Sequence, residues 1–195
     1  MSEEHIARTG YDDFLDVLKK FRGLSAIALG TSVTVPFVAY LSGIVPPWPP
    51  GVVLVTALLE LVVLVVVFQF LRNSPRRVTN RVIAVSAPLL VVFSALYLLL
   101  FSFFTYPIPT SSTRSVKGFV CQNGLLKSYA ESCPFLTTDH LKDVAYTAEA
   151  LWQGWSIDLM RFFLVTSWLS AFLLLSVVIG SFVVFQTRVT PRRMR

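Results

Sequence analysis

Residues 52–71 read VVLVTALLELVVLVVVFQFL, an apolar run whose only charged residue is Glu60. At a rise of 1.5 Å per residue, a helix of this length spans about 30 Å, the thickness of the hydrocarbon core of a bilayer. Uncharged apolar runs at 24–45, 82–106 and 162–187 meet the same criterion. The sequence therefore predicts an all-α integral membrane protein, built as a bundle of four transmembrane helices.

The distribution of charge predicts how the chain is oriented. Most of its 17 lysines and arginines flank the predicted spans on one side. Positive charge near span ends marks the cytoplasmic face, so we expect both termini, the basic loop 72–81 and the basic tail 188–195 to be cytoplasmic. Without a long basic domain, nucleic acid is not an expected partner. The expected partners are anionic lipids of the inner leaflet, contacted by Arg72, Arg76, Arg77, Arg81, Arg192 and Arg193.

The N-terminal segment 1–23 has the pattern of an amphipathic helix. Apolar residues at helical spacing, from Tyr11 to Phe21, share one face. We expect this helix to lie on the inner leaflet, with docking of a cytosolic partner as the alternative. The run 24–45 behind it is longer than the apolar core of a signal peptide, and it is therefore expected to be a retained span.

The outer connections differ in length. A proline-rich turn at 46–51 joins the first two spans, while residues 107–161 form a small extracytoplasmic domain between the third and fourth. Apolar residues at helical spacing predict an amphipathic helix over 138–160, which caps the bundle or lies on the outer leaflet. Tryptophans favour the interface between membrane and water, so the expected outer anchors are Trp48, Trp152 and Trp155.

Both cysteines of the chain, Cys121 and Cys133, lie in the predicted extracytoplasmic domain. In that oxidising location we expect them to form a disulfide bond. Four spans with a larger disulfide-bearing loop between the third and fourth resemble the arrangement of tetraspanins. The Cys-Cys-Gly motif of that family is missing, so no functional residue is carried over from it.

Glu60 is the one charged residue inside the predicted spans, which contain no Lys, Arg or His. Counted by helical rise from the outer ends, Thr34, Ser94 and Ser170 fall at a similar depth, which predicts a polar layer near the midplane. A carboxyl isolated in hydrocarbon is expected to carry its proton. Glu60 then either fastens helices together by hydrogen bonds to hydroxyls, or it has a functional role: it lines a path for protons or cations, or pairs with a cation of a partner subunit. The sequence leaves these two roles open.

The sequence contains no recognisable motif for nucleophilic, nucleotide-dependent or metal-dependent catalysis. Both histidines lie outside the spans, and we expect neither a cofactor nor a metal site. The first hypothesis is a non-enzymatic subunit that assembles with itself or with another membrane protein. A homo-oligomeric channel or pore-forming effector with Glu60 lining its path is the alternative, and a lipid-modifying enzyme dependent on His140 or Asp139 is the third.

Overall fold

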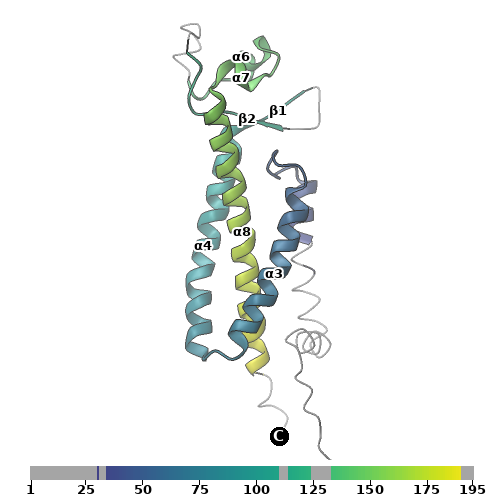
Figure 1. Cartoon of the computed structure of the whole chain (residues 1–195), viewed down its shortest axis with the longest axis vertical. Helices are drawn as coiled ribbons and strands as arrows, with labels where there is room; N and C mark the ends of the chain where they lie inside the picture. Colours follow the sequence, from purple (N-terminus) through teal and green to yellow (C-terminus); the bar gives the residue numbers. More distant parts are fainter. Residues whose placement is uncertain (1–29, 31–33, 110–113, 124–132, 190–195) are drawn as a thin grey trace, which may run out of the picture. The chain divides into compact units, whose positions relative to one another are not determined.

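The chain is mostly helical, and the computed structural model describes residues 30, 34–109, 114–123 and 133–189 (Figure 1). Three helices are long and apolar enough to cross a membrane: α3 (Val52–Arg72), α4 (Arg76–Phe104) and α8 (Gly154–Val189). They contain most of three predicted spans and fit an integral membrane protein. Of the predicted first span, residues 34–41 are helical. Residue 30 is also helical, whereas residues 42–45 are not. The rest of that span and the predicted interfacial helix lie outside the described residues.

The turn between α3 and α4 is shorter than the predicted loop 72–81. Proline has no N–H with which to continue α3, but its fixed φ suits the start of a helix. The carbonyl of Pro75 accepts a hydrogen bond from the amide of Val78 at 2.9 Å, and α4 begins at Arg76. The arginines of this region therefore lie mainly on the first turns of α4 rather than in a loop.

Two compact units make up the chain, and α4 and α8 each pass through both of them. The first unit comprises Met1–Ser42, Val53–Leu90 and Phe172–Arg195. Its described core is apolar, and within it residues of α3 pack with Val184 of α8. The α3 residues of this core follow helical spacing along one face: Leu64, Phe68 and Leu71.

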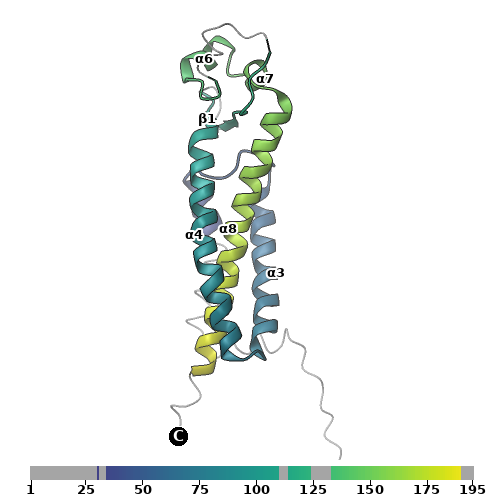
Figure 2. The ribbon, with the colours of Figure 1, turned by 90° about the vertical axis from the view of Figure 1, so that its left-hand side faces the viewer.

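The second unit comprises Gly43–Val52 and Val91–Ala171. The fold prediction lacked its two-stranded antiparallel sheet, in which β1 (Thr105–Pro107) pairs with β2 (Arg114–Val116). The short helix α7 (Ala148–Leu151) lies next to the N-terminal end of α8, while α6 (Thr138–Asp143) lies on the side of β1 (Figure 2). Tyr97 of α4 packs edge-on against Trp168 of α8, with ring centroids 5.1 Å apart.

The prediction of one continuous helix over 138–160 is wrong, because the helical conformation is interrupted twice in that range. Ala145 and Tyr146 adopt left-handed backbone conformations with φ of 52° and 58°. Trp152 is extended, and it forms an isolated antiparallel bridge with Cys121. Contacts with distant residues therefore override the local helical pattern, and the last part of the range belongs to α8.

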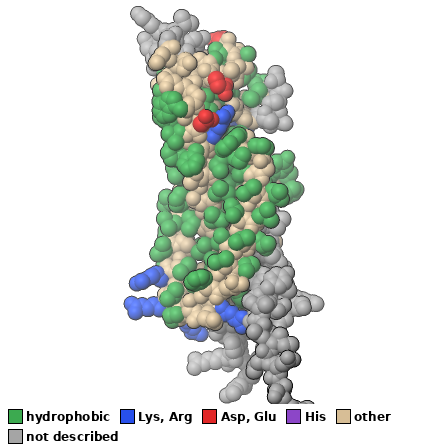
Figure 3. Space-filling model, in the orientation of Figure 1, with side chains coloured by type: hydrophobic (Ala, Val, Ile, Leu, Met, Phe, Trp, Pro, Cys, Tyr) green, Lys and Arg blue, Asp and Glu red, His purple; other side chains and the backbone are tan. Residues whose placement is uncertain are grey.

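The described helices present a largely apolar surface. Hydrophobic side chains cover most of the face shown in Figure 3, with charged side chains in small groups. Most of the large exposed side chains of α3 and α4 are aliphatic, as expected of helices surrounded by lipid.

Candidate functional site

A row of buried side chains runs along α3 at intervals of four residues. Such residues share one face of a helix, with successive side chains about one turn apart. After Val52 comes a polar part, formed by Thr56 and Glu60, and the row then continues into the apolar part that joins the core of the first unit. In chain order the row contains Val52, Thr56, Glu60, Leu64 and Phe68.

The carboxyl of Glu60 is enclosed and without hydrogen bonds to the described part of the chain. Its side chain is 0% exposed, and neither Oε1 nor Oε2 has a partner there. The arginine on the same helix, Arg72, is twelve residues away, or about 18 Å along the axis. With no opposite charge close to it on α3, the carboxyl is expected to be protonated.

The buried face of α8 meets the buried row of α3 at close range. A methyl group built on Gly180 would lie 3.1 Å from Cγ1 of Val67 and 3.7 Å from the carbonyl oxygen of Leu64. The backbones can therefore approach here because position 180 has no side chain, as the small-residue spacing of Ser176 and Gly180 predicts.

The same contact aligns a buried hydroxyl of α8 with Glu60. Both helices run in the same direction in Figures 1 and 2. Ser176 precedes Gly180 by one turn, just as Glu60 precedes Leu64, so helical geometry brings Ser176 and Glu60 to the same level. Ser176 is also fully buried. Thr56 precedes Glu60 by one turn on the buried face of α3, and Ser176 lies at about the level of Glu60 on α8; the depth-based prediction included neither residue.

The predicted polar layer is not joined to Glu60 by hydrogen bonds between described residues. Thr34 is exposed, while Ser94 and Ser170 are partly buried and belong to the second unit. Helical rise gives the depth of a residue but not the direction of its side chain, which explains the difference. The spacing of four between Thr56 and Glu60 was the available signal.

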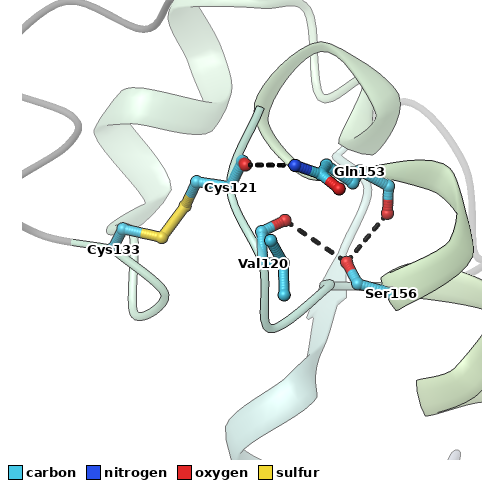
Figure 4. The surroundings of a disulfide bond; sticks show 5 residues. All are labelled: Val120, Cys121, Cys133, Gln153 and Ser156. Atoms are coloured by element: carbon cyan, nitrogen blue, oxygen red, sulfur yellow. Dashed lines mark hydrogen bonds between the residues drawn. A yellow bond between two sulfur atoms is a disulfide. The ribbon is translucent and has the colours of Figure 1, made fainter. Parts of the chain in front are cut away.

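The predicted disulfide bond between Cys121 and Cys133 is confirmed (Figure 4). It lies beside a set of hydrogen bonds that connect this segment to the start of α8. Gln153 Nε2 donates to the carbonyl of Cys121 at 3.3 Å, and Ser156 Oγ lies 3.3 Å from the carbonyl of Val120 and 2.8 Å from that of Gln153. The segment around Cys121 is therefore both cross-linked to Cys133 and hydrogen-bonded to the start of α8.

The three predicted tryptophan anchors occupy different environments. Trp152 is 0% exposed, so its side chain faces the interior of the second unit, and its predicted place at headgroup depth stays a prediction. Its pairing with Cys121 turns it into the interior of the second unit. Trp48 and Trp155 are 50% and 55% exposed. Contact of these two with lipid headgroups stays a prediction.

The predicted lipid-contacting arginines Arg72, Arg76, Arg77 and Arg81 are exposed at the adjoining ends of α3 and α4. Glu60 is the only acidic residue that the structure describes in the first unit. These arginines therefore give the described part of that unit a positive end. Arg192 and Arg193 lie outside the described residues.

Charged residues of the second unit have local partners. Burial lowers the pKa of Lys117, whose ammonium donates to the carbonyl of Leu136 at 3.2 Å. A hydrogen bond from Lys142 to Asp139, with an N–O distance of 2.8 Å, lowers the pKa of that exposed carboxyl. No group of three potential metal ligands occurs among the described residues. A catalytic role for His140 or Asp139 stays a prediction.

A comparison of the chain with protein-family models, curated proteins and solved structures finds no match.

Proposed function

We propose that the chain is a non-enzymatic membrane protein that takes up and releases protons at Glu60. The observation that carries this proposal is the enclosed carboxyl, whose two oxygens lack hydrogen-bond partners among the described residues. A carboxyl that only fastened helices would donate to a neighbouring hydroxyl or carbonyl. Ionisable groups within spans usually serve function, and a proton is the ligand that a neutral buried carboxyl already holds.

Exchange of this proton requires a change in the contacts of α3. Because Glu60 is enclosed by its own chain, a path formed only between subunits would not reach it in the structure described. We propose that α3 moves relative to its neighbours, so that water reaches the carboxyl and accepts its proton. The carboxylate then takes up another proton before it is enclosed again.

Proton flux into liposomes tests this role. The vesicles contain the wild-type chain and a trapped pH-sensitive dye. We expect their interior to acidify when the external pH is lowered. Valinomycin and potassium would clamp the membrane potential. In Glu60→Gln the rate should fall to that of protein-free vesicles, because an amide cannot exchange the proton. Glu60→Asp should retain part of the flux.

A control on the same helix separates the loss of this group from a general effect of substitution. Gln69 is an exposed polar residue of α3 outside the buried row, and Gln69→Leu should leave the flux unchanged. Equal flux in wild type and Glu60→Gln, with both proteins folded and inserted, would refute the proposed role.

A second candidate function is assembly with further membrane helices, either from copies of this chain or from another protein. The observation that favours it is the weak internal cover of α4. Only 11% of its most apolar 18-residue window is buried by the chain, against 39% in α8. Lipid can cover such a surface, but a partner helix can cover it equally well.

Mass determination in mild detergent tests self-assembly. We expect a defined oligomer of the 21.8 kDa chain. Leu99 of α4 and Leu58 of α3 are each 57% exposed. Leu99→Trp should dissociate an oligomer formed through α4, and Leu58→Trp should leave it intact. A wild-type monomer without a co-purifying membrane protein would contradict assembly.

A further inference from the structure

The first unit contains an open groove between α4 and α8, with a volume of about 330 Å³. We call it the Arg81 groove. All of its lining residues belong to the first unit. They are Arg81, Val82, Val85, Ser86, Leu89 and Leu174.

The Arg81 groove follows one face of α4 and has apolar walls. From Arg81 to Leu89 the helix rises by about 12 Å, a large part of one leaflet of the hydrocarbon core. The one hydroxyl in the lining, that of Ser86, donates to the carbonyl of Val82 at 2.7 Å. Because this hydroxyl is already satisfied within the helix, the groove fits a hydrocarbon chain.

One end of the groove carries a positive charge. Arg81 is exposed, and no ion pair joins it to a described residue. Arg76 and Arg77 lie one turn earlier on α4, and the only described acid of this unit, Glu60, is enclosed. A guanidinium group with free donors matches the geometry and charge of a phosphate.

We propose that the Arg81 groove binds one anionic phospholipid. An acyl chain lies along Val82, Val85 and Leu89, and the phosphate accepts hydrogen bonds from Arg81. This is more specific than a general attraction of basic residues to the membrane surface, since one residue and one groove select the lipid. The site is independent of the role proposed for Glu60.

A second groove between the same helices provides a comparison within the chain. It has a volume of about 320 Å³ and is lined by Asn80, Ile83, Ala84, Phe182 and Phe185. This Asn80 groove has nearly the same size and equally apolar walls, but no cation in its lining. It should therefore accept lipid without preference for a negative headgroup.

Native mass spectrometry of the full chain in detergent tests the site. The probes are dioleoylphosphatidylglycerol and dioleoylphosphatidylcholine, which have the same acyl chains; the first has a net negative headgroup and the second a headgroup without net charge. We expect the wild-type chain to bind one phosphatidylglycerol in preference. Arg81→Gln should weaken that binding by about fivefold and leave phosphatidylcholine unaffected, as is typical for one arginine at a membrane surface. Arg81→Lys should retain most of the preference.

Variants that fill one groove separate a bound lipid from a surface effect. Val85→Trp fills the Arg81 groove and should remove the preferred lipid, whereas Ala84→Trp fills the Asn80 groove and should preserve it. Soluble glycerol phosphate should not displace the lipid, because it lacks an acyl chain. The proposal is overturned if Arg81→Gln keeps the wild-type preference, if Val85→Trp binds normally, or if glycerol phosphate competes.

Discussion

Glu60→Met should raise the free energy of unfolding by about 1–3 kcal/mol, because it removes a buried carboxyl without a partner among the described residues. Methionine has a similar length and is apolar, so it fills the same space with little strain. The increase should appear in a denaturant titration in mild detergent, followed by circular dichroism. Most core substitutions destabilise, so a gain at this position would be diagnostic.

Leu64→Ala is the matched comparison, one turn further along the same buried row. It shortens a buried apolar side chain and should lower the free energy of unfolding by about 2–5 kcal/mol. Opposite signs at the two positions would show that the row stabilises the fold only in its apolar part. A loss of stability in Glu60→Met would mean that the carboxyl has a stabilising partner. Glu60 would then have the structural role of holding helices together.

A buried residue that lowers the stability of the fold is most simply explained by a functional role. Glu60→Met should therefore be more stable than the wild type and yet fail to carry protons. Measured on the same preparation, the two results would separate the structural and functional roles that the sequence left equal.

The sequence was sufficient to predict that α3, α4 and α8 are long and apolar enough to cross a membrane. The length of an apolar run decides whether a helix can cross hydrocarbon, and that property is local. The ends were less predictable. Pro75 favours a helix start at Arg76, so α4 begins before the predicted span at 82. Helix α8 begins at Gly154, eight residues before the predicted span at 162.

Contacts between distant residues account for what the sequence did not predict. The bridge from Cys121 to Trp152 interrupts the expected helix. It could not be predicted from the spacing of apolar residues within 138–160, because Cys121 lies outside that range. The disulfide was predictable because only two cysteines exist and both lie in one segment. Glu60 was found as an isolated charge, whereas the level of Ser176 relative to Glu60 follows only from the packing of α8 against α3 at Gly180.

Gly118→Ala should destabilise the second unit by about 1–3 kcal/mol or more, because the site has no room for a methyl group. The added carbon would lie 2.7 Å from Cβ of Trp152 and 2.3 Å from Oγ of Ser156. Cβ of Trp152 is fixed by the backbone, which pairs with Cys121. Ser156 Oγ is held between the carbonyls of Val120 and Gln153. Relief of the clash must therefore disturb the packing beside the disulfide.

Gly154→Ala is the control in the same unit, because a methyl group there meets nothing within 4 Å. Position 154 opens α8, where alanine is at least as favourable as glycine, so stability should be unchanged or slightly higher. Limited proteolysis of the oxidised proteins in detergent should cleave Gly118→Ala faster between 114 and 153, and spare Gly154→Ala. Equal protection of both variants would show that Trp152 does not pack closely over Gly118. We expect the second unit to be stabilised by the packing of the buried indole of Trp152 as well as by the disulfide. Equal protection would contradict the contribution of Trp152.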